Sequence, residues 1–204
     1  MDGMNSEKAM EDLEVIRRVM EGCIRVQERE GIFFKIWGLL IPGAFIGNLV
    51  LVHFGRMHLA GFLWGAAMIA GIVASILVSS RRKRVNHRST GASLQKSIWL
   101  GSWISIAVVL TAGMTSRVLN TSGSMMMIAL VMGGSYYTSG TLSGSRMLRL
   151  AAVLWWVTGI ITVFIPGEWA PYLVAAGTFF FSFIPGVILD RAYRKNSPGA
   201  ADEA

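Results

Sequence analysis

The chain has 204 residues, of which 53% are hydrophobic and 15% charged, and its mean hydropathy is +0.52. An ordinary soluble domain carries about 25% charged residues, whereas this chain has no acidic residue between Glu30 and Glu168. That composition excludes a soluble surface, and the single cysteine, Cys23, excludes a disulfide-stapled secreted scaffold. The sequence therefore predicts an all-α, polytopic integral membrane protein.

The first 30 residues are predicted to form a cytoplasmic amphipathic helix, which makes 1–30 the first of three regions. Apolar residues recur close to the heptad spacing of a coiled coil. Because such a helix must bury its apolar face, we expect packing within the molecule, against a second copy, against a cytoplasmic protein partner, or on the membrane. The candidate docking face consists of Met10, Leu13, Ile16, Met20 and Cys23.

Six apolar segments follow in the second region, 31–190, and each is long enough to cross the membrane as a helix. A span needs about 20 mostly apolar residues to cross about 30 Å of hydrocarbon, and lipid offers no partner for an unpaired backbone group. Polar residues around Tyr136 dilute the fourth segment. The predicted spans are 36–54, 59–79, 97–116, 124–143, 148–166 and 170–189.

These six spans are predicted to pair as three hairpins, each with a short external turn. The second span of each hairpin carries small residues, including the pair Gly61 and Gly65 in the first and the pair Gly140 and Gly144 in the second. Small residues let helix backbones approach closely, so we expect a compact bundle. The even number of spans in each unit argues against an inverted transporter repeat.

The distribution of lysine and arginine predicts the orientation in the membrane. All of these residues except Arg56 and Arg117 fall on the side that also holds both termini. Basic residues stay in the cytoplasm, so both termini are predicted to be cytoplasmic in a bacterial inner membrane. This asymmetry explains the sequence pI of about 10.1 without a nucleic-acid partner. A basic run is a candidate contact for lipid headgroups: Arg81, Arg82, Lys83 and Arg84.

Few residues in the predicted spans could carry chemistry. No charged residue lies in the middle of a span, and the sequence shows no metal-binding motif and no catalytic arrangement. We therefore predict a protein without enzymatic activity, cofactor or metal. The tyrosine hydroxyls of the fourth span need partners, which suggests either helix-to-helix hydrogen bonds or a polar pocket. The candidate pocket consists of Asn48, Tyr136, Tyr137 and Thr138.

The third region, 191–204, is polar and rich in small residues, and it is predicted to be a disordered cytoplasmic tail. Its last nine residues, from Asn196 onward, include Ser197, Pro198 and Gly199. No apolar run in this region is long enough to join the bundle.

Several segments together resemble a known group of proteins. The helix at 11–21 leads into Phe33-Phe34-Lys35-Ile36-Trp37-Gly38, and the segments 134–140 and 183–189 follow later. This set resembles a family of small bacterial membrane proteins with six spans, over nearly the whole chain. The plan of three hairpins is similar, in architecture only, to the acid-resistance membrane protein family. Both resemblances imply the fold, and neither implies catalytic residues.

Two functional hypotheses follow from these observations. The first is a structural or regulatory membrane module whose N-terminal helix mediates self-association or the docking of a partner. The alternative is a small channel or transporter for a neutral or weakly charged solute, lined by the candidate pocket. A docking module requires the face that includes Leu13 and Ile16, whereas a pore requires Asn48 or Tyr136.

Overall fold

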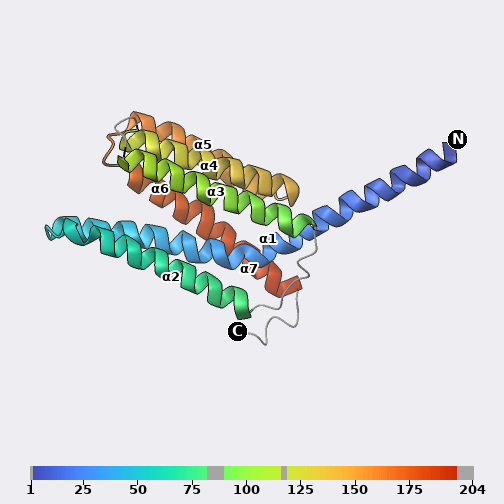
Figure 1. The fold of residues 1–204 in the computed structure, drawn as a ribbon, viewed down its shortest axis with the longest axis horizontal. Helices are drawn as coiled ribbons and strands as arrows, with labels where there is room; N and C mark the ends of the chain where they lie inside the picture. Colours follow the sequence, from blue (N-terminus) through green and yellow to red (C-terminus); the bar gives the residue numbers. More distant parts are fainter. Residues whose placement is uncertain (1, 82–89, 116–118, 197–204) are drawn as a thin grey trace.

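The computed structural model describes residues 2–81, 90–115 and 119–196, and every regular element in these ranges is helical (Figure 1). The all-α prediction is confirmed for this part of the chain. In chain order the helices are α1 (Asp2–His53), the short 3-10 helix η1 (Met57–Leu59), α2 (Ala60–Arg81), α3 (Thr90–Thr115), α4 (Thr121–Leu142), α5 (Arg146–Phe164), α6 (Ala170–Thr178), the π-helical turn η2 (Phe179–Phe183) and α7 (Ile184–Asn196).

Five helical segments are long and apolar enough to cross a membrane, so the chain has the helices of a multi-pass membrane protein. They are Gly31–His53, Met57–Ser80, Ser93–Gly113, Arg146–Phe164 and Ala170–Ala192. The predicted fourth span corresponds to α4, which has 22 residues. It is not among the five, because serines, threonines and glycines in its second half lower its hydropathy.

Helix α1 is a single helix of 52 residues, although the sequence analysis separates a cytoplasmic helix from the first span at Gly31. Gly31 stays helical because its missing side chain lets α1 approach α7 closely. The first part of α1, residues 2–30, is called the arm below, and most of it projects beyond the ends of the other helices (Figure 1). At 1.5 Å per residue the arm is on the order of 40 Å long.

The remaining helices form a bundle in which α4 and α5 share the most extensive contact, followed by α1 and α7. Helices α3, α4 and α5 lie side by side, and α2 lies at the edge, packed against α1 (Figure 1). The last two predicted spans, α5 and α6 with η2, are predicted to pair as a hairpin. In the structure α5 packs less extensively against α6 and η2 than against α4. Glycines explain the difference: Gly133 faces Trp156, and Gly140 faces the backbone of Arg149.

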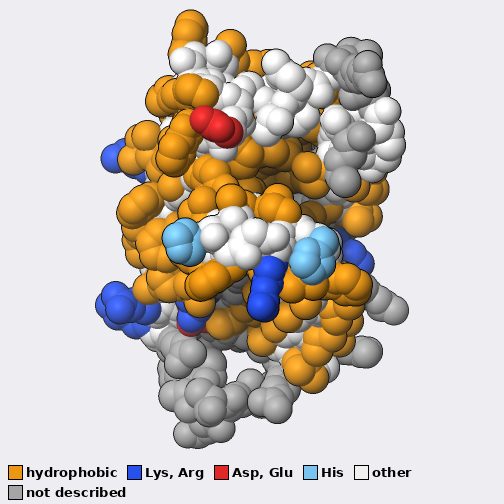
Figure 2. All heavy atoms as spheres, turned by 90° about the vertical axis from the view of Figure 1, so that its left-hand side faces the viewer, with side chains coloured by type: hydrophobic (Ala, Val, Ile, Leu, Met, Phe, Trp, Pro, Cys, Tyr) orange, Lys and Arg blue, Asp and Glu red, His pale blue; other side chains and the backbone are white. Residues whose placement is uncertain are grey.

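The α1–α2 and α5–α6 connections lie at the end of the bundle opposite the arm, where α3 also ends and α4 begins (Figure 1). Gly55 follows α1 with φ +65°, a left-handed conformation that other residues adopt at a cost. Figure 2 views this end and shows mostly hydrophobic side chains with few charged ones. Charged and histidine side chains exposed near these connections include His53, Arg56, His58 and Glu168. The end is therefore poor in charge.

The opposite end carries the C-terminus of α7. The predicted disordered tail is helical from residue 191 to Asn196, and residues 197–204 lie outside the described part. Helix α7 continues past the apolar segment because Arg191 and Lys195 place positive charge near its C-terminal carbonyl groups, where the helix dipole favours cations.

The contact between α1 and α7 depends on two facing glycines. A β-carbon added to Gly186 would lie 2.8 Å from the carbonyl oxygen of Gly31 and 2.8 Å from the backbone nitrogen of Lys35. One added to Gly31 would lie 2.7 Å from the backbone nitrogen of Asp190. Backbone atoms cannot move aside as a flexible side chain can, so these glycines set the spacing of the two helices.

We expect Gly186→Ala to lower the free energy of unfolding by about 1–3 kcal/mol, the usual cost of overpacking. The change forces α7 away from α1, and thermal unfolding in detergent measures the loss. Gly101→Ala is the matched control, because a β-carbon at Gly101 meets no atom within 4 Å. Equal effects of the two substitutions would contradict the role of close packing at Gly186.

Candidate functional site

A charged pair joins the first and last helices of the bundle close to the facing glycines. The Lys35 ammonium donates a hydrogen bond to the Asp190 carboxylate, with Nζ and Oδ2 2.7 Å apart. Asp190 is 3% exposed, whereas the Lys35 side chain is one quarter exposed. A buried carboxylate within a membrane segment is unusual and often functional. Asp190 falls just outside the predicted last span, which ends at residue 189, so the sequence does not indicate a buried carboxylate there.

A second polar contact links α4 to the π-helical turn η2. The Tyr136 hydroxyl donates a hydrogen bond of 2.7 Å to the Ser182 hydroxyl, and Tyr136 is completely buried. The Tyr136 ring also contacts Phe34 and Trp99, which contact each other, with centroids 5.0–5.5 Å apart. Helices α1, α3, α4 and η2 therefore meet around one tyrosine.

The π-helical turn has an identifiable sequence cause. Pro185 has no backbone N–H, so the carbonyl of Phe181 loses its normal partner four residues later. Insertion of one wider turn relieves such a break, and π-helical turns often occur at functional sites. This turn presents the Ser182 hydroxyl to Tyr136.

The four residues of the predicted polar pocket do not come together. Tyr136 bonds to Ser182 rather than to Asn48 on α1. Tyr137 is 47% exposed and packs its ring against Trp156, with centroids 5.6 Å apart. Thr138 is exposed and donates a hydrogen bond to the carbonyl of Gly134 on its own helix. The reason is helical geometry, because three consecutive residues on a helix point about 100° apart.

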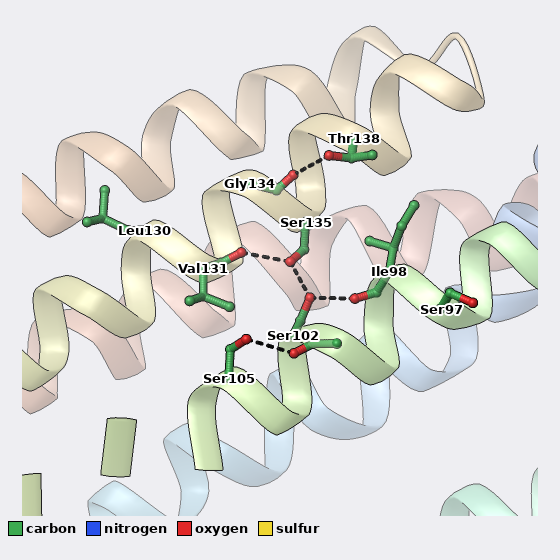
Figure 3. A pocket seen from close by; sticks show the side chains of 10 residues that line it. Ser97, Ile98, Ser102, Ser105, Leu130, Val131, Gly134, Ser135 and Thr138 are labelled. Carbon is green, nitrogen blue, oxygen red and sulfur yellow. Dashed lines mark hydrogen bonds between the residues drawn. The ribbon is translucent and has the colours of Figure 1, made fainter. Parts of the chain in front are cut away.

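Thr138 instead lines a groove between α3 and α4, shown in Figure 3. The groove has a volume of about 370 Å³. Gly101 and Gly134 leave space in the groove, since a β-carbon added to either residue would meet no atom within 4 Å. The groove is lined by Ser97, Ile98, Gly101, Ser102, Ser105, Leu130, Val131, Gly134, Ser135 and Thr138.

The hydroxyl groups of Ser102, Ser105, Ser135 and Thr138 in this groove are already hydrogen-bonded within the bundle. Ser102 and Ser135 contact each other across the groove, and each also donates to a carbonyl four residues earlier on its own helix. Ser105 bonds in the same way to Gly101 (Figure 3). Lipid can therefore cover these side chains without stranding a donor. The arrangement joins two helices and offers no nucleophile with an adjacent base.

Some buried polar atoms lack a protein partner. Among the described residues, the Ser139 hydroxyl and the Trp99 and Trp155 indole nitrogens are buried without a hydrogen bond. Buried polar atoms of this kind are often satisfied by ordered water. Ser139 lies one helical turn after Tyr136 on α4, so the polar interior extends along that helix.

The predicted docking face is exposed wherever its side chains are described. Met10, Leu13 and Ile16 are 69%, 65% and 56% exposed. The side chains of Met20 and Cys23 lie outside the described part. Arg17 and Glu21 form an ion pair of 3.1 Å along the arm, which supports its helical form.

The remaining predicted sites give less information. Arg81 is the last residue of α2, and Arg82, Lys83 and Arg84 lie outside the described residues. In the described ranges no group of three or more His, Cys, Asp or Glu side chains could hold a metal ion. Comparison of the chain with protein-family models, curated proteins and solved structures gives no match.

Removing the charge of Lys35 should destabilise the protein more than removing the charge of Asp190. We expect Lys35→Met to lower the free energy of unfolding by about 3 kcal/mol, since the buried carboxylate loses the Lys35 ammonium. Asp190→Asn should cost less, because the partly exposed Lys35 can turn toward water. Unfolding by heat or detergent measures both. A double variant, Lys35→Met with Asp190→Leu, should recover much of the loss; equal single effects without recovery would contradict this coupling.

Proposed function

We propose that the chain is a non-enzymatic integral membrane protein whose arm mediates self-association or docks a cytoplasmic partner. The observation that carries this proposal is the arm that projects from the bundle (Figure 1), on which Met10, Leu13 and Ile16 are exposed. Apolar residues exposed on one face of a helix in water favour association. The bundle then serves to hold the arm at the membrane.

The membrane topology is part of the same proposal. We infer six spans, with α4 as the sixth, and both termini in the cytoplasm of a bacterial cell with an inner membrane. The length of α4 and its contact with the membrane-length helices α3 and α5 support the sixth span. Six spans place the arm and the C-terminal end of α7 on one side, where the basic residues gather.

Two substitutions on the full-length chain test the docking function. We expect Leu13→Asp combined with Ile16→Asp to reduce recovery of any co-purifying partner, including another copy, at least about tenfold, because each apolar side chain contributes about 1.5–3 kcal/mol when buried. Affinity purification from membranes with mass spectrometry measures the recovery. Val15→Asp is the matched control, since Val15 is 54% exposed at a position outside the predicted face. Equal recovery from all three proteins would contradict the proposal.

A second candidate function is a small channel or transporter for a neutral or weakly charged solute. The polar interior favours it: Tyr136 with Ser182, the buried Asp190, and the unpartnered Ser139 hydroxyl among the described residues. Such groups could line a path for water or a small solute. This path differs from the predicted pocket, because Tyr137 and Thr138 are exposed.

Solute flux in liposomes separates this candidate from the docking module. If the bundle conducts, vesicles that contain the protein should take up glycerol or urea faster than protein-free vesicles. Tyr136→Phe should then change the rate by several fold, because it removes the hydroxyl bonded to Ser182, whereas the exposed Tyr137→Phe should not. Uptake at the protein-free rate would contradict a channel for these solutes.

A further inference from the structure

The arm carries a regular pattern that indicates what covers it. Leu13, Ile16, Met20 and Cys23 follow one another at spacings of three, four and three residues, as do the a and d positions of a coiled coil. Leu13 and Ile16, whose side chains are described, are both more than half exposed. No other described helix reaches this part of α1 (Figure 1).

The opposite face of the arm has the charges that a coiled coil requires. With Leu13 at position a, every b and f position from residue 7 to residue 28 holds a charged residue. These are Glu7, Glu11, Glu14, Arg18, Glu21, Arg25 and Glu28. Positions b and f face water in a coiled coil. The arm therefore has one face for a helical partner and one for solvent.

The same heptad register continues into the bundle, where other helices cover it. Phe34 at position a is buried, and Ala44 at position d is buried as well. Trp37, also at d, packs against Trp103 of α3 with ring centroids 4.8 Å apart. The polar residues Gln27 at a and Glu30 at d divide the apolar positions of α1 into two stretches. Helices of the same chain cover the inner stretch, whereas Leu13 and Ile16 in the outer stretch are exposed.

We propose that a second copy of this chain covers the arm, as a parallel coiled coil over residues 9–27; this rests on the proposed function of the arm. Copies inserted by one rule share an orientation, so their arms run parallel. Parallel pairing brings each a or d residue to its own counterpart. It also places position g of one helix near position e of the next heptad in its partner. Asp12 occupies g and Arg17 occupies e, so the sequence offers opposite charges there.

Cys23 provides a direct test because it is the only cysteine and occupies position d. In membranes with a low protein-to-lipid ratio, copper phenanthroline and oxygen should join two Cys23 thiols. One disulfide forms as the thiols lose two protons and pass two electrons to the oxidant. We expect a cross-linked dimer on a non-reducing gel that reduction with dithiothreitol reverses. Cys23→Ser should give none.

Substitutions in the arm show whether the cross-link reports pairing or random collision. Leu13→Asp combined with Ile16→Asp should reduce the dimer at least tenfold, whereas Val15→Asp, at the solvent-facing c position, should leave it unchanged. Two differently tagged full-length copies should also co-purify through the same residues. A dimer equally abundant in all variants would overturn the proposal, because it would show collision alone.

These cross-linking and co-purification results also distinguish pairing with a second copy from the broader docking function of the arm. Absence of the cross-link together with failure of the tagged copies to co-purify would overturn pairing with a second copy. If a different protein were still captured through Leu13 and Ile16, the docking function would stand and only the identity of the partner would be wrong. If nothing were captured at all, both proposals would fall.

Discussion

The close contact between α1 and α7 is the constraint on which the rest of the structure depends. Gly31 and Gly186 bring two backbones together, and the Lys35–Asp190 pair lies beside them. Without a hydrophobic force between helices in lipid, close packing and polar contacts must hold them together. This contact joins the first and last helices of the bundle and fixes the direction in which α1 leaves it.

The polar contacts of the interior follow from that arrangement. Phe34 is adjacent in sequence to Lys35 and places its ring against Tyr136 and Trp99. Tyr136 reaches Ser182, which the π-helical turn before α7 turns inward. The Phe34 ring on α1 and the Ser182 hydroxyl before α7 thus meet at Tyr136, so this hydrogen bond and this packing stabilise the same geometry. A polar interior of this kind specifies one arrangement of apolar helices that could otherwise slide.

The sequence predicts the helical class and most membrane segments because apolar runs of about 20 residues have few alternatives in lipid. It does not predict that α1 passes Gly31 without a break, because glycine signals a boundary unless a close neighbour is known. It identifies Tyr136 as a residue that needs a partner, yet Ser182 lies 46 residues away. It also misses the Lys35–Asp190 pair, 155 residues apart. The opposite charges of Lys35 and Asp190, which border the first and last predicted spans, are the signal that could have revealed it.

Because α1 is continuous, the bundle sets the direction in which the arm points. An arm attached through a flexible link would sample many directions. The arm would lose that freedom when a partner binds, and the lost entropy would weaken binding. Here one helix carries both the arm and the residues packed against α7 and α3. The direction of the arm is therefore set in the bundle before any partner is met. A change at the α1–α7 contact would alter that direction, and a force on the arm would reach Lys35 and Asp190 through a continuous backbone. The bundle and the arm thus share one continuous helix, as the proposed docking function requires.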